Sequence, residues 1–319
     1  MADGLGAPLA APLFERLALI GLGLIGSSIA RVARRKRLAG AIVAADTAED
    51  VRKRAAQLGL ADTITKSAAA AVEGADLVIL CVPVGAIEEV AQEVAPHLRV
   101  GAIVSDVGSV KSAVAAAFAK HLPAGVHALP AHPVAGTEQS GPDAGFATLF
   151  CNRWCILTPP EGAAPKAVAR LSEFWTSAGA NVEIMNAAHH DLVLAITSHV
   201  PHLIAYNIVG TAADLETVTQ SEVIKFSAGG FRDFTRIAAS DPTMWRDVFL
   251  NNKEAVLEML GRFTEDLTAL QRMIRNGDAQ GLFDLFTRTR EIRRGIIAEG
   301  QETAAPDFGR RTGEEEDRS

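Results

Sequence analysis

The first half of the chain alternates short apolar runs with segments whose apolar residues recur every three or four positions. The apolar runs are typical of buried strands, and the segments between them are typical of amphipathic helices. Strands are predicted at residues 17–23, 41–46, 75–83 and 102–108, and helices at residues 27–37, 48–59, 86–98 and 110–122. Later strands at 154–160 and 181–185 flank a helix at 165–178. This alternation predicts βαβ units and a mostly parallel sheet covered by helices on both faces.

Beyond about residue 185 the β pattern ends and only helical spacing remains. One helical pattern covers residues 186–210 and contains Pro201, which should kink the helix. A Gly-rich break is expected at Gly229 and Gly230.

A second long helix is predicted with Ser240 or Asp241 as its N-cap and Pro242 at its first position, and it should continue to about Arg275. Such a helix would span about 50 Å, which is more than a domain of this size can cover alone. We therefore expect a partner subunit. The sequence predicts an α/β domain at residues 13–185, an all-helical domain at 186–300 and a disordered tail at 301–319.

Composition narrows the class of protein. The 319 residues are 48% hydrophobic and carry a net charge of −7, which gives no electrostatic support for a nucleic-acid partner. The apolar run 17–30 is too short for a membrane span and contains three glycines. The three cysteines lack C-x-x-C spacing, so we expect reduced thiols; a zinc site at Cys151 and Cys155 is the less favoured alternative. We expect a soluble cytoplasmic protein.

A glycine motif lies between the first predicted strand and the helix that follows it. Gly21, Gly23 and Gly26 form G-x-G-x-x-G, and Asp46 ends the second strand about 20 residues later. The pattern predicts a Rossmann domain whose helix N-terminus holds a pyrophosphate. Asp46 would bond the adenosine ribose and repel the 2′-phosphate of NADP, so NAD is favoured. Alternatively, the glycines only make a tight turn and Asp46 caps a loop.

Two further loops are expected at the carboxyl edge of the sheet, where folds of this class bind ligands. One covers residues 105–111 and contains Ser109; the other covers 129–146 and contains His132 and Glu138. His132 could accept a proton near neutral pH, and Ser109 could orient it or bind a substrate. A single loop histidine is more often structural, but two such loops beside a dinucleotide site favour a catalytic function.

The helical half contributes a polar stripe. Ala195, His199, His202 and Tyr206 share one face of an otherwise apolar helix. The two histidines could also be hydrogen-bonded core residues, or metal ligands together with His190. No H-E-x-x-H motif is present, and hydride transfer needs no metal.

A Gly-rich turn is expected to present arginines from the helical half. Arg232, Asp233 and Arg236 lie close to it, and an arginine there suits bidentate capture of a carboxylate. An ion pair with Asp233 or Asp247 is the structural alternative.

Five segments together resemble one enzyme family: GLGLIGSS, DVGSVK, AHPVAGTEQSGP, HHDLVLAITSHVPHLIA and GGFRDFTRIAASDPTMWRDVF. They are similar to the prephenate/arogenate (cyclohexadienyl) dehydrogenases of tyrosine biosynthesis, in the same order, from about residue 14 to 298. The resemblance implies a Rossmann domain, an all-helical dimerisation domain and therefore a homodimer. It also implies NAD-dependent oxidative decarboxylation of prephenate or arogenate.

The resemblance also implies a function for individual residues. His132 matches the catalytic histidine, and Ser109 the serine that bonds this histidine and the substrate. Residues expected to bind substrate are Thr137, Glu138, His199, His202 and Arg236. Residues expected to bind the cofactor are Gly21, Gly23, Leu24, Ile25, Gly26, Asp46, Val82 and Pro83.

Two other functions are compatible with a Rossmann domain followed by helices. A β-hydroxyacid dehydrogenase would need a catalytic lysine in the segment 186–203, which contains none. A non-catalytic NAD-sensing regulator should lack a base beside the nicotinamide, whereas His132 and Ser109 are both available. The sequence does not distinguish prephenate from arogenate.

Overall fold

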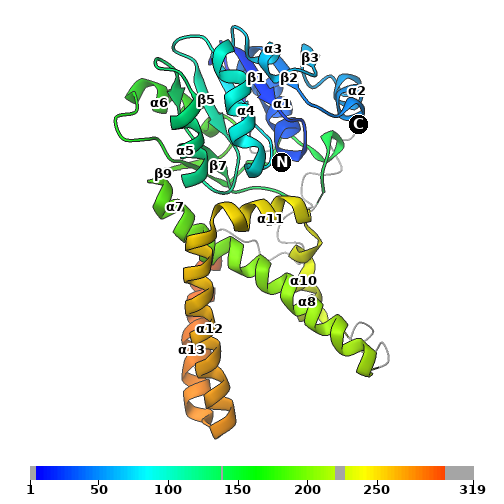
Figure 1. Ribbon diagram of the computed structural model, residues 1–319, viewed down its shortest axis with the longest axis vertical. Coiled ribbons are helices and arrows are strands. Elements are labelled where there is room, and N and C mark those ends of the chain that lie inside the picture. Colours follow the sequence, from blue (N-terminus) through cyan, green and yellow to red (C-terminus); the bar gives the residue numbers. More distant parts are fainter. Residues whose placement is uncertain (1–4, 138, 220–226, 299–319) are drawn as a thin grey trace. The chain divides into compact units, whose positions relative to one another are not determined.

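The computed structural model describes residues 5–137, 139–219 and 227–298 (Figure 1). Glu138 and the predicted tail at 301–319 lie outside the described residues. The chain divides into two compact units, Met1–Val256 and Leu257–Ser319.

The first unit is built on a parallel sheet of six strands in the order β3-β2-β1-β4-β5-β6. The chain order reverses between β1 and β4, which is the switch point where such sheets bind ligands. The predicted Rossmann fold is confirmed. Its strands are β1 (Phe14–Ile20), β2 (Ala39–Ala45), β3 (Thr63–Thr65), β4 (Leu77–Leu80), β5 (Ile103–Asp106) and β6 (His127–Ala128). Its helices are α1 (Leu24–Lys36), α2 (Glu49–Gln57), α3 (Ala68–Val72), α4 (Ile87–Val94), α5 (Ser112–His121) and α6 (Pro165–Ser177).

Strand β1 shows why both faces of the sheet are apolar. Leu17 and Leu19 pack into the core that contains residues of α1 and α6, whereas Ala18 and Ile20 pack against α3, α4 and α5. Alternate residues of a strand point to opposite faces, so a strand buried on both sides is apolar throughout. Cys155 lies in the first of these cores.

A second, three-stranded sheet forms where the sequence pattern predicted a loop and two strands. It contains β7 (Ala131–Pro133), β8 (Trp154–Leu157) and β9 (Asn181–Ile184), with β7 antiparallel to β8 and β8 parallel to β9. The prediction that His132 lies in a loop is therefore wrong. Prolines favour extended backbone at and before their positions. Pro130 precedes the three-residue strand β7 and Pro133 is its last residue, and this strand pairs with β8. The glycine-rich composition describes the chain only after Val134.

The predicted helix at 186–210 is interrupted. Helix α7 (Ala187–Leu194) is followed by a π-helical turn (Ala195–His199) and then by α8 (Val200–Thr219). Pro201 cannot donate a hydrogen bond to the carbonyl four residues earlier. The π-helical turn lies directly before this proline. Such turns are frequent at functional sites.

Two other helical predictions are corrected. Gly229 and Gly230 begin α10 (Gly229–Thr235) and do not form a break. The helix predicted from Asp241 is two helices, α11 (Pro242–Asn251) and α12 (Lys253–Asn276), separated at Asn252. The start was predicted correctly, because the Asp241 side chain accepts the Met244 N–H at 2.8 Å. The break shortens the long helix to about 36 Å.

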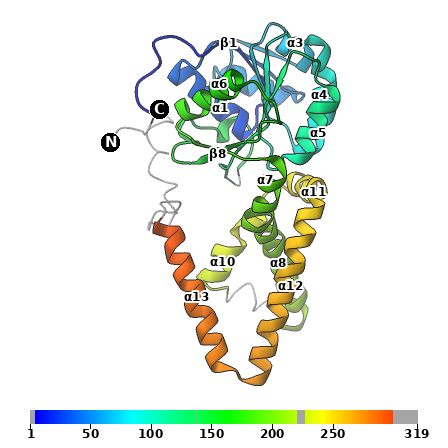
Figure 2. The ribbon, with the colours of Figure 1, turned by 90° about the vertical axis from the view of Figure 1, so that its left-hand side faces the viewer.

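The second unit contains most of α12 and a helix that no predicted element covered, α13 (Ala279–Ala298). The chain turns between them at Gly277, which has a positive φ of 65°. The helices diverge from this turn (Figure 2). Apolar side chains are exposed along both: Leu267, Ile274, Phe283, Phe286 and Ile292.

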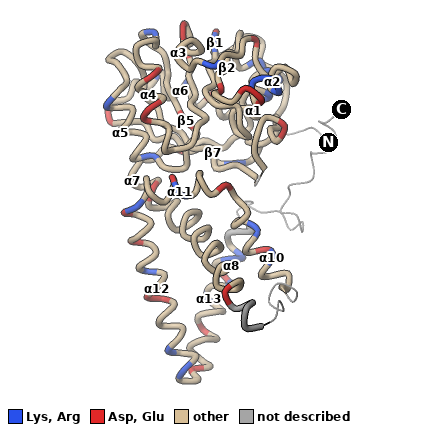
Figure 3. The backbone as a smooth tube through the Cα atoms, turned by 45° about the vertical axis from the view of Figure 1, so that its right-hand side comes forward, with Lys and Arg blue, Asp and Glu red and all other residues tan. Residues whose placement is uncertain are grey.

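Charged side chains of both signs are distributed over the part of the chain that the structure describes. Lys and Arg are interspersed with Asp and Glu along the tube in Figure 3. The run Ala187–Asp214 is long and apolar enough to cross a membrane by length and composition alone. It contains the π turn, and its buried His190, Asp191 and His199 make polar contacts inside the first unit. Of the most apolar window of this run, 28% is buried. Ionisable residues such as these are rare inside membrane spans.

Candidate active site

The glycine motif forms the turn between β1 and α1. Gly21 has a φ of 99°, and a Cβ on it would lie 2.4 Å from the Cys81 carbonyl oxygen. A Cβ on Gly26 would lie 2.0 Å from the Gly21 carbonyl oxygen, so the fold itself requires these two glycines. A Cβ on Gly23 would meet no atom within 4 Å. Packing therefore does not explain Gly23, whereas close approach of a pyrophosphate does.

The first turn of α1 is open to an anion. Gly23 is the N-cap and supplies no side-chain hydrogen bond, and Leu24 and Ile25 follow it. The first N–H groups of a helix have no partner within the helix and attract negative charge. Val82 and Pro83 follow β4 on the other side of the switch point, where Val82 Cγ1 lies 3.4 Å from the Cβ position of Gly21. These residues fit the diphosphate of a dinucleotide.

Asp46 lies at the end of β2 beside the same turn. Its Oδ2 accepts the Leu22 N–H and its Oδ1 accepts the Ala48 N–H, each at 2.9 Å. The carboxylate is therefore fixed where a ribose would lie. The sequence supplied no cation at residues 47 and 48, but the structure brings Arg52 to this loop: its Nη1 donates to the Asp46 and Thr47 carbonyls at 2.9 Å.

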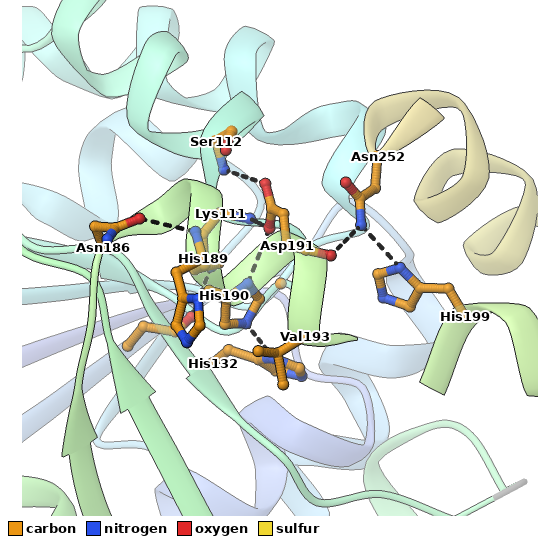
Figure 4. A network of polar contacts seen from close by, with 12 residues as sticks. Lys111, Ser112, His132, Asn186, His189, His190, Asp191, Val193, His199 and Asn252 are labelled. Carbon is orange, nitrogen blue, oxygen red and sulfur yellow. Dashed lines mark hydrogen bonds and ion pairs between the residues drawn. The ribbon is translucent and has the colours of Figure 1, made fainter. Parts of the chain in front are cut away.

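His132 begins a chain of three side chains (Figure 4). Its Nδ1 lies 2.8 Å from Nε2 of His190, and Nδ1 of His190 lies 2.8 Å from Oδ1 of Asp191. His132 comes from β7, whereas His190 and Asp191 come from α7. All three side chains are buried.

Asp191 is held in its ionised form. Its Oδ1 accepts the Lys111 N–H at 2.7 Å, and its Oδ2 accepts the Ser112 N–H at 2.8 Å, both at the start of α5. Burial alone would raise the pKa of this carboxyl, but the bonds from His190, Ser112 and Lys111 hold the pKa below its usual value.

The ionised Asp191 determines where the protons lie in the chain. Because the carboxylate only accepts, Nδ1 of His190 donates and its Nε2 accepts. Nδ1 of His132 must then donate to His190, which leaves the lone pair of His132 on Nε2. Burial lowers the pKa of His132 well below its usual value, and His190 and Lys111 lower it further. His132 is therefore neutral at pH 7, with Nε2 as the basic atom; among the described residues none forms a hydrogen bond to that atom.

Ser109 lies in the turn after β5 and is partly exposed. Nδ1 of His132 is hydrogen-bonded to His190. Among the described contacts, no hydrogen bond joins Ser109 to His132. The backbone of Ser109 instead interacts with His199. The predicted bond between Ser109 and substrate stays a prediction.

The predicted polar stripe converges on Trp245 of α11. The His202 ring stacks on the indole with centroids 3.7 Å apart, and the His199 ring meets it edge-on at 6.1 Å. Tyr206 packs in the same cluster, and its hydroxyl donates to the Ser240 carbonyl. The expectation that these side chains share a face is confirmed.

The two histidines of this stripe are neutral. Burial lowers the pKa of His199 to about 4, and its Nδ1 lies 3.1 Å from the Asn252 amide nitrogen. Burial also lowers the pKa of His202, and the charge of Arg236 lowers it further. Arg236 therefore lies close to His202, as the sequence interpretation requires. Asp247, one of its suggested partners, pairs with Arg246 at 2.7 Å.

Thr137 lies in the loop that follows β7, where its hydroxyl accepts the Gln139 N–H at 3.2 Å. Glu138, the next residue, is outside the described residues. Two parts of the same loop return to the nucleotide-binding half: Phe146 N–H donates to the Ser28 hydroxyl, and Asp143 pairs with Arg54 at 2.6 Å.

Sequence reasoning missed the residues behind His132. His190 was considered only as a metal ligand, and Asp191, Lys111 and Asn252 were not assigned a function. A signal existed for one pair: His190 and Asp191 are adjacent in the first turns of a helix capped by Asn186. Adjacent residues do not face one another on a helix, so the pattern alone gave no reason to join them.

Two family models match the chain. The model described as prephenate dehydrogenase, nucleotide-binding domain, matches residues 29–184, and the model described as prephenate dehydrogenase, dimerization domain, matches residues 186–288.

Curated relatives and solved structures agree with these matches. The chain is 42% identical to a cyclohexadienyl dehydrogenase of Zymomonas mobilis, over 88% of this chain and 96% of that protein. It is 33% identical to a prephenate dehydrogenase of Bacillus subtilis, over 92% of this chain and 79% of that one. The structure of Aquifex aeolicus prephenate dehydrogenase in complex with hydroxyphenyl propionate and NAD+ matches with a TM-score of 0.83 and 33% identity. That match covers 88% of this chain and 98% of the other.

Proposed function

The chain belongs to the prephenate dehydrogenase family, and we propose that it oxidatively decarboxylates prephenate, arogenate or both with NAD as the hydride acceptor. The observation that carries this proposal is the chain from Asp191 through His190 to His132, which ends in an unprotonated ring nitrogen. The glycine turn, the N-terminus of α1 and Asp46 fit the diphosphate and ribose of a dinucleotide. Bound NAD supplies the acceptor for the hydride that leaves the ring carbon.

His132 acts as the general base. Its Nε2 takes the proton of the ring hydroxyl while the hydrogen on the same carbon leaves as hydride, so that carbon becomes a carbonyl. The bond to the ring carboxylate then breaks, CO₂ departs, and its electron pair passes into the ring, which becomes aromatic. Because aromatisation drives the reaction, the protein mainly orients groups and keeps His132 neutral.

The other predicted residues bind substrate in this proposal. Arg236 holds a substrate carboxylate, and the neutral His199 and His202 present ring nitrogens beside it. Ser109 follows β5 near His199, and Thr137 and Glu138 follow β7 in the sequence. An arginine is suited to a carboxylate because its planar fork donates two parallel hydrogen bonds.

We also propose the assembly and the boundaries expected from the sequence. The match to a dimerization domain and the exposed apolar side chains of α12 and α13 support a homodimer through the C-terminal helices. The proposed domains are residues 13–185 for the nucleotide and 186–300 for substrate and dimerisation. The relatives are named as cyclohexadienyl and prephenate dehydrogenases, and we propose a cytoplasmic location.

One experiment tests the function directly. NADH formation is measured with prephenate and with arogenate in parallel, using the wild-type chain and His132→Asn. We expect turnover with at least one substrate and a fall in kcat of about 10²-fold or more in the variant, the usual range for a lost general base. The acidic limb of the pH profile should disappear with it. A wild-type protein that binds NAD but oxidises neither substrate would reject the proposed reaction.

A further inference from the structure

Asp106 and Lys111 form an ion pair, and neither residue is among the site residues predicted from the sequence. Lys111 Nζ contacts Asp106 Oδ2, and both side chains are completely buried. Asp106 is the last residue of β5, and Lys111 is the N-cap of α5. The pair therefore lies at the carboxyl edge of the sheet, where the proposed active site is.

Stability alone is a weak reason for such a pair. Removing two charges from water is unfavourable, and apolar side chains of similar volume often stabilise a fold as well or better. A buried pair is better explained by what its remaining donors and acceptors hold in place.

The remaining atoms of the pair hold the residue that precedes His132. Asp106 Oδ1 accepts the Ala131 N–H at 3.1 Å, and Lys111 Nζ donates to the Ala131 carbonyl at 2.7 Å. Strand β7 lies at the edge of its sheet, with β8 on one side only. The Pro130 carbonyl accepts the Thr158 N–H, and the Val134 N–H donates to the Trp154 carbonyl. Backbone groups alternate in direction along a strand, so the N–H and the carbonyl of Ala131 face away from β8. The ion pair satisfies both groups and so fixes the strand that carries His132.

Lys111 also contacts Asp191, the last of the three hydrogen-bonded side chains that begin with His132. Its backbone N–H donates to Asp191 Oδ1 at 2.7 Å. One residue thus binds the strand of His132 through Nζ and the carboxylate of Asp191 through its backbone. The separation between these two, which the His190 ring spans, depends on Lys111 (Figure 4).

The turn between the two charged residues is fitted to this arrangement. Gly108 N–H donates to Asp106 Oδ2 at 2.8 Å, and a Cβ on Gly108 would lie 3.0 Å from that oxygen. Burial lowers the pKa of His132, and the Lys111 charge lowers it further. Lys111 therefore also favours the neutral form of the base that the pair positions.

We propose that Asp106 and Lys111 are positioning residues that fix the place and the tautomer of His132. The proposal rests on the proposed function, because it assigns His132 as the base.

The test replaces both charges at once. The double variant Asp106→Leu with Lys111→Met keeps an apolar pair of similar length and leaves no single buried charge, so it should fold. We expect kcat to fall about tenfold or more, since small misplacements of a catalytic group have large effects on rate. Substrate KM and the Kd for NAD should stay within about twofold, and the acidic limb of the pH profile should move to higher pH.

A matched control lies at the opposite edge of the sheet. Asp76 is buried, pairs with Arg170 at 2.9 Å, and accepts the N–H groups of Glu15 and Arg16 at the start of β1. Asp76→Asn removes a comparable clamp on the backbone, so it should lower the melting temperature while leaving the pH profile of kcat unchanged. This comparison separates loss of stability from loss of positioning.

A second readout does not depend on turnover. The nitrogen chemical shifts of His132 in histidine-labelled protein report which ring nitrogen carries the proton. We expect Nδ1–H in the wild type and a mixture of tautomers in the double variant. A folded double variant with wild-type kcat, pH profile and His132 tautomer would overturn the proposal. Failure of the wild type to oxidise either substrate would instead reject the proposed function, and the tautomer would still decide the positioning.

Discussion

His132 Nδ1 lies 2.8 Å from His190 Nε2, so the base of the proposed reaction is oriented by a second imidazole. Asp191 acts on His132 through that ring. In the more familiar arrangement a carboxylate contacts the catalytic histidine directly and fixes its tautomer. Inserting one neutral imidazole preserves the result, because each ring accepts on one nitrogen and donates from the other. The intermediate ring also keeps the negative charge of Asp191 away from the base.

His190 should therefore matter for rate although it needs no contact with substrate. We expect His190→Leu to lower kcat by about 10- to 100-fold, because His132 loses its acceptor and its tautomer is no longer fixed. The matched control is the preceding residue: His189 is exposed, so His189→Leu should leave kcat unchanged. Steady-state kinetics on both variants decide the matter. Equal effects at 189 and 190 would show that the relay formed by Asp191, His190 and His132 takes no part in catalysis.

Asp46 should determine the choice of cofactor. Its carboxylate is fixed at the ribose position and would repel a 2′-phosphate, so kcat/KM should be at least about tenfold higher with NAD than with NADP. Asp46→Ser should narrow that ratio, because Arg52 already lies at the same loop and can then face the phosphate. Adding Arg52→Ala to Asp46→Ser should lower kcat/KM with NADP again, because the cation that can face the 2′-phosphate is then lost. A wild-type protein that uses both cofactors equally would contradict this function of Asp46.

The cofactor half of the site could be predicted from sequence because its chemistry is local. Gly21, Gly23 and Gly26 lie within one turn, and the strand and helix beside them follow from apolar periodicity. Asp46 is more distant in sequence, but the regular length of a βαβ unit fixes its position.

The relay could not be predicted, because its partners are separated by 58 positions and meet only through packing. His132 was assigned to a loop since composition describes the residues after Val134 better than the three-residue strand before it. The helix break at Asn252 likewise follows from a tertiary contact. Asn252 donates to the Asp191 carbonyl at 2.9 Å, a bond that no local pattern contains.

Folding stability should fall between pH 7 and pH 5, partly because of His199. Burial lowers its folded-state pKa to about 4, below the unfolded value of 6.5, so the unfolded state binds more protons in this range. The stabilisation is complete above about pH 6.5 and is lost as the pH falls towards 4. From pH 7 to 5 this single group should account for about 2 kcal/mol. Urea unfolding at both values should show that dependence reduced in His199→Gln but not in His189→Gln. An unchanged dependence in His199→Gln would contradict the assignment.

The C-terminal helices should hold two chains together. The exposed apolar side chains Phe283 and Phe286 of α13 are typical of an interface. Light scattering at micromolar concentration should give twice the chain mass of 33.6 kDa. Phe283→Glu with Phe286→Glu should yield the monomer, whereas Val100→Glu, at an exposed turn of the first unit, should leave the dimer intact. A stable monomer in the wild type would rule out the proposed assembly.

Arg236 should act chiefly in binding. The substrate has two carboxylates, and one leaves as CO₂; a cation held firmly against the departing group would oppose that step. Interactions that are equal in the ground and transition states affect KM and leave kcat unchanged. We therefore expect Arg236→Gln to raise the substrate KM by about 10- to 100-fold, or about 1.4–2.8 kcal/mol, with little change in the KM for NAD. Arg232, exposed one helical turn earlier, is the matched control, and Arg232→Gln should be silent. Because the Arg236 charge lowers the pKa of His202, the His202 pKa should rise in the Arg236 variant alone. A collapse of kcat with unaltered substrate KM would instead make Arg236 a transition-state residue.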